Sequence, residues 1–498
     1  MPLGVPQIPP TRKHPHLYEI NTWLWLEELS KRAGRRITLS EVPENEWDRL
    51  AAWGFDLVWL MGVWQRSPIA RRLARQDPSD QREFDVSRPG WKLEDVVGSP
   101  YAVQDYRPDP RIGVLADLDL VRTKLNDRGM RLILDFVSNH TALDHPWIET
   151  HPEYYVRGSL DDFRRDPAAF FLVEHANGAC DLIARGRDPY FPPWKDTAQL
   201  NFFEPAARKA VMSQLREIAR HCDGFRCDMA MLLLNDIFHR VWSGYWGAAK
   251  PPVTEFWAEA RNWLPETILI AEAYWDTEQT LIDLGFSFCY DKHFYDALRA
   301  GDAAGLRARL HAPPGPQACM VRFLENHDEP RSAATFGSRL EAAGALMATA
   351  PGMRLYHQGQ FEGRKIHFPI PLGSAADETP DAATEAFYWK ILSLTRDDAF
   401  HFGDWRAREC EPTHDANGLV CLEWRMPKSW KLVVVNIADA PSEGQVRFGE
   451  ELQRDRNYIF FDALHDARYP RNGSELRDRG LYVRLDPWRA HLFDITPV

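Results

Sequence analysis

The feature of this sequence that most limits its fold is the alternation of short, almost wholly apolar runs with amphipathic helical patterns. Near-continuous apolar strands that alternate with helices are typical of a parallel sheet buried on both faces. Eight such runs predict a closed barrel of eight β/α units. The runs are YEINTWLWL from Tyr18, DLVWLMGV from Asp56, RLILDFV from Arg131, GFRCDMAM from Gly224, ILIAEAY from Ile268, FSFCYD from Phe286, VRFLEN from Val321 and MRLYHQG from Met353.

Two regions depart from this alternation and predict further domains. Residues 141–201 are rich in Pro, Asp and Arg and show no clear helix, which indicates a small domain inserted after the third strand. After the helical pattern FYWKILSLTRDDAF, short strand-like runs such as KLVVVNIAD and QVRFG predict an all-β sandwich. The predicted fold class is therefore α/β: a (β/α)8 TIM barrel over 1–140 and 202–401, an inserted domain B over 141–201 and a C-terminal β-sandwich domain over 402–498.

Composition narrows the range of partners. The formal net charge of −12 and the pI near 5.8 argue against a nucleic-acid partner, which would favour a basic patch. Apolar runs stay well short of the roughly 18 residues that a membrane span needs, and the N-terminal segment lacks the pattern of a secretory signal. The seven cysteines are odd in number and include no CxxC pair, which favours reduced thiols over disulfides or a cysteine zinc site. We expect a cytoplasmic protein that binds neither nucleic acid nor membranes.

Polar side chains follow four of the predicted strands at their C-terminal ends, where barrels of this type place catalytic groups. Carboxylates rarely face a core without partners, so several of them at one mouth predict a functional site. Paired carboxylates suit glycoside hydrolysis, in which one attacks the anomeric carbon and the other protonates the leaving oxygen. The residues are Asp135, Asn139 and His140 for the third strand, Arg226 and Asp228 for the fourth, Glu272 for the fifth, and Asn326, His327 and Asp328 for the seventh.

Four of these segments carry a family resemblance. DFVSNH, GFRCDMA, IAEAY and ENHDEP resemble the four signature regions of the α-amylase family (glycoside hydrolase family 13), in the family's order. DTAQLNF is similar to a fifth family motif, and GSPYAVQDY resembles the segment that supplies a sugar-stacking tyrosine. The resemblance covers nearly the whole chain, because the family also has a small domain after strand three and a C-terminal β-sandwich.

The resemblance implies catalytic roles for three carboxylates. Asp228 would be the nucleophile that forms a covalent glycosyl intermediate, Glu272 the general acid/base, and Asp328 a ligand of the distorted sugar's hydroxyls. Arg226 and Asp228 are i and i+2 on a strand and point to one side, so the cation would orient the carboxylate and keep it ionised. Glu272 has apolar neighbours in sequence and no adjacent cation, so we expect Asp228 to raise its pKa.

Substrate-binding roles follow in the same way. The resemblance implies that His140 and His327 hydrogen-bond the reacting sugar, that Arg226 supports the site and that Tyr101 stacks beneath the sugar ring. Tryptophan, with 19 residues, fits both sugar stacking and core packing.

The chain also departs from the family pattern. Met231 and Leu232 stand where many starch-active relatives carry Lys-His, and Ala102 stands where several oligosaccharide-specific relatives carry Asp. Asn139 matches a calcium ligand of the family, but the other ligands are not identifiable in RGRDPYFPPWKD, and calcium takes about six to eight oxygens. We therefore expect no structural Ca²⁺, and the chemistry requires no cofactor.

The sequence predicts a retaining hydrolase of α-glucosidic bonds in malto-oligosaccharides or α-glucans. The alternative is a transglycosylase or isomerase of the same family, such as a glucanotransferase or a sucrose- or trehalose-acting enzyme, in which a sugar hydroxyl replaces water. A non-enzymatic relative, such as the heavy chain of an amino-acid transporter, is disfavoured by the full set of carboxylates. Bond type, endo or exo action, chain-length preference and oligomeric state stay open.

Overall fold

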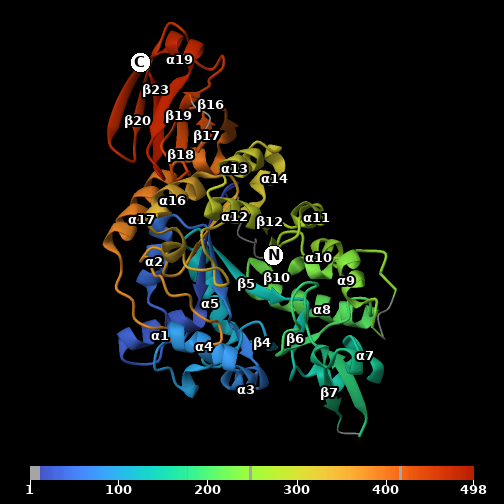
Figure 1. Ribbon diagram of the computed structural model, residues 1–498. Helices are drawn as coiled ribbons and strands as arrows, with labels where there is room; N and C mark the ends of the chain where they lie inside the picture. The colour runs from blue at the N-terminus through green and yellow to red at the C-terminus, as the bar shows by residue number, and fades with distance from the viewer. Residues whose placement is uncertain (1–11, 176–177, 246–249, 414–417) are drawn as a thin grey trace, which may run out of the picture.

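The structure is a computed structural model of the chain that describes residues 12–175, 178–245, 250–413 and 418–498 (Figure 1). Its largest element is a closed barrel of eight parallel strands, in which β1 and β14 close the ring. Each of the eight strands overlaps its predicted apolar run, and the predicted fold class is confirmed. The strands are β1 (His16–Asn21), β2 (Leu57–Met61), β5 (Arg131–Val137), β10 (Gly224–Asp228), β11 (Ile268–Ala271), β12 (Phe288–Tyr290), β13 (Met320–Arg322) and β14 (Met353–His357).

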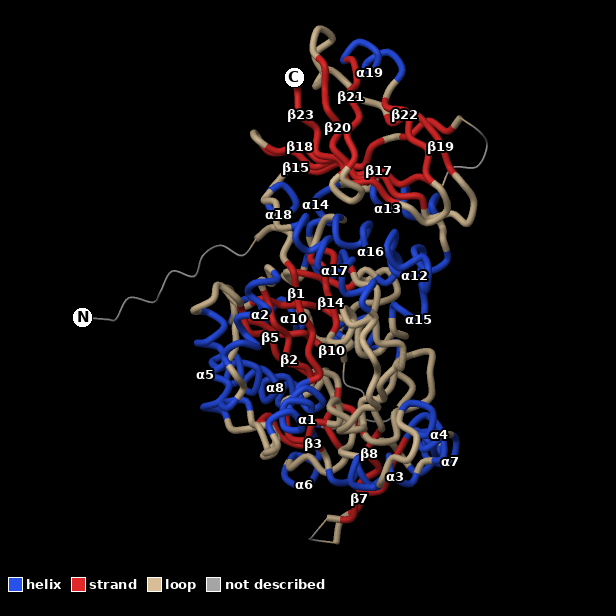
Figure 2. Tube along the Cα trace, turned by 90° about the vertical axis from the view of Figure 1, so that its left-hand side faces the viewer, coloured by secondary structure: helices blue, strands red, loops and turns tan. Residues whose placement is uncertain are grey.

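Helices lie around the strands of the barrel (Figure 2). Strands β2, β5 and β10 are buried at every residue, which explains their near-continuous apolar sequences. Gly224 begins β10 because a Cβ there would lie 2.5 Å from the carbonyl oxygen of Ile268 on the next strand. The larger outer helices are α1 (Thr22–Ala33), α2 (Glu44–Trp53), α5 (Leu115–Asn126), α8 (Pro205–Ile218), α10 (Phe256–Trp263), α12 (Lys292–Ala300), α16 (Leu340–Thr349) and α17 (Ala382–Thr395).

Shorter elements complete the loops and the margins of the barrel. They are β3 (Trp64–Arg66), α3 (Pro68–Gln76), α4 (Pro78–Ser87), β4 (Val103–Pro108), α9 (Asn235–Trp242), α11 (Glu278–Asp283), α13 (Ala303–Leu310), α14 (Pro314–Ala318), α15 (Ser332–Phe336) and α18 (Ala399–Phe402). None of the helices formed by the described residues has the length and apolar character needed to span a bilayer.

The prediction that YEINTWLWL is a strand throughout is wrong in its second half. Strand β1 ends at Asn21 and helix α1 begins at Thr22. The Asn21 side chain accepts the backbone N–H of Leu24 at 3.2 Å, and this N-cap starts the helix. A short apolar run fits the buried face of a helix as well as a strand, so apolar content alone did not separate the two.

The segment 141–201 contains two strand pairs and two short helices. Strand β6 (His140–Ala142) pairs with β9 (Thr197–Gln199), and β7 (Phe170–Glu174) pairs with β8 (Cys180–Ala184). The expectation of no helix is wrong, because α6 (Trp147–Thr150) and α7 (Leu160–Arg165) form there. A reciprocal capping box between Ser159 and Asp162 starts α7. The S-x-x-D spacing of Ser159 and Asp162 is visible in the sequence and could have predicted the start of this helix.

The C-terminal region packs two antiparallel sheets on each other. A six-stranded sheet runs in the order β15-β17-β18-β23-β20-β21, and a three-stranded sheet runs β16-β19-β22. Apolar side chains such as Leu432, Val434 and Phe460 fill the space between them. Val433 and Val435, which alternate with Leu432 and Val434, belong to the barrel core together with Trp424, so the six-stranded sheet packs on the barrel. The elements are β15 (Asp404–Arg408), β16 (Cys410–Pro412), β17 (Leu419–Met426), β18 (Ser429–Asn436), β19 (Ser442–Val446), β20 (Asn457–Asp462), β21 (Ala467–Asn472), α19 (Gly473–Arg479), β22 (Leu481–Leu485) and β23 (Ala490–Pro497).

One strand of this region is shifted from its prediction. Strand β19 covers Ser442–Val446, whereas the predicted run QVRFG begins at Gln445. Gly444 lies inside the strand because a Cβ there would come within 2.6 Å of the carbonyl oxygen of Glu411 on β16.

Candidate active site

The carboxyl ends of the barrel strands border a cavity of about 700 Å³. Asp228 is the last residue of β10, Glu272 directly follows β11, and Asp328 lies in the loop after β13. These three carboxylates line the cavity together with Tyr101 and His140. The structure therefore places these predicted residues together at the mouth of the barrel, as expected for polar residues at the carboxyl ends of barrel strands.

Arg226 is the centre of the charge cluster. Its Nη1 atom lies 2.7 Å from Oδ1 of Asp228, and its Nη2 atom lies 2.9 Å from Oε2 of Glu272 and 3.9 Å from Oδ2 of Asp328. The Arg226 side chain is only 1% exposed. One buried guanidinium thus lies within 4 Å of three carboxylates.

The register of neighbouring strands explains the contact between Arg226 and Glu272. Arg226 pairs with Ile270 across β10 and β11, so Glu272 lies two residues further along the adjacent strand, on the same side. The expectation that Glu272 has no adjacent cation is wrong, because that cation comes from the neighbouring strand and not from the local sequence. The faces of Trp59 and Tyr101 each lie 5.3 Å from the Arg226 guanidinium and confine it further.

The environments of the three carboxylates separate their pKa values. Burial raises the pKa of Glu272 to about 7 against the charge of Arg226, and the charge of Asp228 adds to the rise. Burial also raises the pKa of Asp228, while Arg226 opposes it through both its charge and a hydrogen bond. At Asp328 the charge of His327 outweighs burial and lowers the pKa to about 2. Carboxyl groups with separated pKa values are typical of acid/base sites.

Two further groups fix Glu272. The backbone N–H of Met229 donates to its Oε2 at 2.6 Å, and the Tyr274 hydroxyl donates to its Oε1 at 2.9 Å. Met229 directly follows β10 and has a left-handed backbone with a φ of 43°. A non-glycine residue in this conformation next to two carboxylates is typical of a functional site.

His327 joins the site to the first strand. Its Nδ1 atom lies 2.5 Å from Oε1 of the buried Glu19, and its Nε2 atom lies 3.0 Å from Oδ2 of Asp328 and 2.7 Å from the Tyr101 hydroxyl. Burial opposes the charged imidazole, but Asp328 and Glu19 outweigh it and raise the pKa of His327 to about 10. The Tyr101 and His327 rings are stacked, with centroids 5.3 Å apart.

His140 is a neutral member of the site. Burial lowers its pKa to about 4, its Nε2 atom lies 3.1 Å from the Tyr101 carbonyl oxygen, and its ring packs against Trp194. The polar atoms of His140 and His327 therefore contact protein groups as well as bordering the site. Their role in binding a sugar stays a prediction.

The other predicted polar residues support the loops. Asp135 accepts the indole N–H of Trp59 at 3.0 Å and the backbone N–H of Gly62 at 2.6 Å. Asn326 accepts the backbone N–H groups of Asp328 and Glu329, each at 2.9 Å, which shapes the loop that carries Asp328.

The surroundings of Asn139 do not fit calcium. Its Oδ1 atom and its backbone oxygen both accept hydrogen bonds from Nε2 of Gln199, at 3.0 and 2.9 Å, and its Nδ2 donates to Oε1 of Gln199 at 3.1 Å. A calcium ligand would instead turn its oxygen toward a group of other oxygens. The two amides thus connect the residue before β6 to β9, and the expectation that the chain holds no structural Ca²⁺ stays a prediction.

Sequence reasoning missed Glu19, Tyr274 and the backbone of Met229. Glu19 interrupts an apolar strand near its C-terminal end, which is the signal that selected the other residues. Tyr274 is two residues beyond Glu272, the same spacing that joins Arg226 to Asp228. Met231 and Leu232, singled out as departures, are buried in a short helical turn, at 0% and 3% exposure.

Comparison with known proteins places this site in context. Residues 48–284 match the family model of the α-amylase catalytic domain. The chain is 29% identical over 279 residues to the α-amylase MalA of Haloarcula japonica, covering 54% of this chain and 37% of that protein. It is 26% identical over 263 residues to a trehalose synthase of Pimelobacter sp., covering 46% and 45%. The matched regions thus span less than half the length of these two relatives.

Solved structures match over a longer range. A noncanonic maltogenic α-amylase, AmyB from Thermotoga neapolitana, aligns with a TM-score of 0.68 and 20% identity, covering 97% of this chain and 99% of that one. At this identity the likeness concerns the fold, and it includes both the barrel and the C-terminal sheets.

Proposed function

We propose that this chain, which belongs to the α-amylase family, hydrolyses α-glucosidic bonds in malto-oligosaccharides or α-glucans with retention of configuration. The observation that carries the proposal is the convergence of Asp228, Glu272 and Asp328 on one guanidinium. Retaining hydrolysis needs an ionised nucleophile beside a protonated acid, and the pKa of about 7 at Glu272 supports this division of roles.

Asp228 is the nucleophile in this proposal. Arg226 holds its Oδ1 at 2.7 Å, so Oδ2 is the oxygen that attacks the anomeric carbon. The bond from the anomeric carbon to the leaving oxygen breaks as the ester to Asp228 forms. Water then attacks the same carbon, and the ester bond breaks to restore the carboxylate.

Glu272 transfers the proton in both steps. Its Oε2 accepts the backbone N–H of Met229 and lies 2.9 Å from Nη2 of Arg226, so in this proposal Oε1 carries the proton of the neutral acid. That proton passes to the leaving oxygen in the first step, and the resulting carboxylate takes a proton from water in the second. The Tyr274 hydroxyl donates to Oε1 and stabilises the carboxylate that the first step leaves behind.

Asp328, His327, Tyr101 and His140 bind the reacting sugar in this proposal. Asp328 is ionised and its side chain is 44% exposed, so it is accessible to sugar hydroxyls. The rings of Tyr101 and His140 line the cavity and offer flat faces to a pyranose.

Aromatic side chains near the cavity support an oligosaccharide substrate. Trp194, Phe191 and Trp275 line it, and Phe191 is 70% exposed. Tyr190 packs edge-on against Trp275 at 5.0 Å, which joins the segment 141–201 to the loop after β11. Exposed aromatic rings that border a polar cavity suit the stacking of additional sugar units.

A trehalose-forming or other transfer reaction is the second candidate. The match to a trehalose synthase of Pimelobacter sp. favours it, because that reaction retains the same covalent intermediate and replaces water by a sugar hydroxyl. The carboxylates alone do not separate the two reactions, since both use them identically.

Product analysis separates the candidates. The protein is incubated with starch, glycogen, maltotriose, isomaltose, sucrose, trehalose and maltose, with and without an acceptor sugar, and products are resolved by size. Hydrolysis predicts reducing sugar in proportion to bonds cleaved. Transfer or isomerised products in excess of free reducing sugar would reject simple hydrolysis, and no turnover of any substrate would reject both.

A cytoplasmic location is part of the proposal. It is supported by the odd number of cysteines in the sequence and by the lack of a CxxC pair among them.

A further inference from the structure

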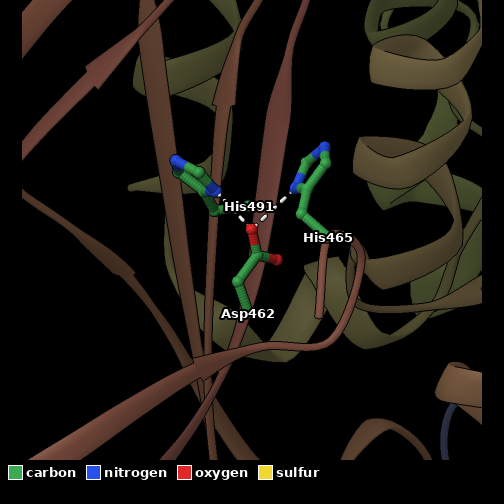
Figure 3. A group of neighbouring side chains, drawn as sticks. All are labelled: Asp462, His465 and His491. Carbon is green, nitrogen blue, oxygen red and sulfur yellow. Dashed lines mark hydrogen bonds and ion pairs between the residues drawn. The ribbon is translucent and has the colours of Figure 1, made fainter. Parts of the chain in front are cut away.

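Three side chains that commonly ligate metals converge in the C-terminal six-stranded sheet, outside the barrel mouth. Asp462 ends β20, His465 lies in the turn that follows, and His491 lies on the neighbouring strand β23 (Figure 3). One ligand atom of each lies within 4.8 Å of the other two, and the described part of the chain holds this one such group of His, Cys, Asp or Glu. The Nδ1 atoms of His465 and His491 each lie 2.6 Å from Oδ2 of Asp462.

The fold fixes the carboxylate before any ligand binds. Antiparallel pairing of β20 with β23 brings Asp462 opposite Phe493, two residues from His491. The backbone N–H groups of Leu464 and Leu492 donate to Oδ1 of Asp462 at 3.1 and 3.2 Å. Oδ1 is thereby occupied, and Oδ2 is directed at the two imidazoles. Hydrogen bonds to the remote oxygen of a ligating carboxylate are typical of metal sites.

The site is closed on one side and open on the other. Asp462 is fully buried, the His491 side chain is 17% exposed and the His465 side chain is 52% exposed. Both Nε2 atoms point away from Asp462 (Figure 3). Each imidazole can therefore carry its proton on Nε2 when its Nδ1 binds a ligand instead of donating to Asp462, and solvent can reach the group past His465.

We propose that Asp462, His465 and His491 bind a divalent transition-metal cation of the zinc class. Two imidazole nitrogens and one carboxylate oxygen are a ligand set that zinc accepts, with water in the remaining position. Neutral imidazoles bind the cation through Nδ1 after the proton moves to Nε2, so any proton lost on binding comes from an imidazolium. Only small side-chain shifts are needed, because zinc–nitrogen and zinc–oxygen distances are about 2.0–2.2 Å.

The cation would stabilise the contact between the sheet and the barrel. The turn after Asp462 contacts helix α17, where Nζ of Lys390 donates to the carbonyl oxygen of Leu464. Ala463 and Leu464 pack against the barrel core. A metal that links this turn to β23 binds only the folded state, so it raises the unfolding temperature.

Zinc titration of the full, untagged chain tests the proposal directly. After treatment with a chelator and its removal, calorimetry with ZnCl₂ is expected to show one equivalent bound. His465→Ala and His491→Gln are each expected to weaken binding by about tenfold or more. His221→Ala is the matched control, because His221 Nδ1 lies 2.8 Å from a single carboxylate, that of Asp119, and its side chain is also 17% exposed. This control is expected to bind zinc as the unaltered chain does.

Thermal unfolding gives a second readout. Zinc is expected to raise the unfolding temperature of the unaltered chain and of His221→Ala but not that of His465→Ala. Because His465 is half-exposed, its replacement leaves the sheet packing intact, so loss of zinc binding in this variant does not reflect unfolding. Absence of stoichiometric zinc binding by the unaltered chain, or equal affinity in His465→Ala, would overturn the proposal.

Discussion

Arginine side chains are buried at both ends of the barrel, and their partners differ. At the mouth, Arg226 contacts the carboxylates of Asp228 and Glu272 and lies 3.9 Å from Asp328. At the opposite end, Arg354 donates to the carbonyl oxygens of Ala350, His14 and Phe400, at 2.9, 3.0 and 2.9 Å. The first arginine is shared among competing charges, whereas the second is satisfied by neutral backbone groups.

Histidines show the same contrast. At the mouth, Asp328 and Glu19 outweigh burial and raise the pKa of His327 to about 10. At the base, burial and then the charge of Arg354 lower the pKa of His14 to about 2 and that of His401 to about 3. The mouth of the barrel therefore holds several ionised groups close together, as an acid/base site requires. The opposite end of the barrel keeps its imidazoles neutral, which stabilises the folded state.

The strongest test of this contrast removes the charge of Asp228. Asp228→Asn is expected to lower kcat by about 10⁴-fold or more, as for other nucleophile replacements. The free energy of unfolding should fall little, because the amide still bonds Arg226 and one buried charge is gone. Hydrolysis of maltotriose and an aryl α-glucoside, together with urea unfolding, measures both quantities. Unchanged activity would remove Asp228 from the mechanism.

The opposite outcome is expected at the base. Arg354→Met removes three buried hydrogen bonds, those to the carbonyl oxygens of Ala350, His14 and Phe400, and should lower the free energy of unfolding by about 3 kcal/mol or more. Activity per folded molecule should stay near that of the unaltered chain. Arg164→Met, at a side chain that is 74% exposed, is the control and should change stability by less than about 0.5 kcal/mol. Equal losses of stability in the two variants would contradict the assigned role of Arg354.

Low pH should destabilise the protein through the two histidines at the end of the barrel opposite the mouth. His14 and His401 have folded pKa values below the ordinary 6.5, so their contribution is complete above pH 6.5 and is lost as the pH falls toward their folded values. At pH 5 each loss amounts to about 2 kcal/mol. His401→Gln is expected to lose correspondingly less stability between pH 7 and pH 5 in urea unfolding. A parallel loss in both proteins would count against this assignment.

The smallest expected effect concerns how kcat/KM depends on pH through the groups at the barrel mouth. If Glu272 is the general acid, as proposed, it must be protonated to act, and kcat/KM for maltotriose should fall about tenfold per pH unit above roughly 7. With α-glucosyl fluoride, whose leaving group needs no proton, this basic limb should disappear. A basic limb that persists with the fluoride would assign the titration to another group.

The sequence predicted the barrel because each buried strand is marked by a continuous apolar run, and it predicted the carboxylates because they interrupt these runs at their ends. It did not predict the contact between Arg226 and Glu272, since that depends on the register of two strands whose sequences lie far apart. The helix that starts at Thr22 was missed because the cap at Asn21 is a local hydrogen bond and not a change in apolar content. The group Asp462, His465 and His491 was likewise hidden, because strand pairing brings its members together.

Trapping of the glycosyl intermediate tests the central claim most directly. A fluorinated α-glucosyl fluoride, which slows the breakdown of the intermediate, is incubated with the protein, and the peptic peptides are examined by mass spectrometry. The account predicts one labelled peptide, with the sugar attached to Asp228. Attachment to another residue, or turnover that releases the product with inverted configuration, would contradict it.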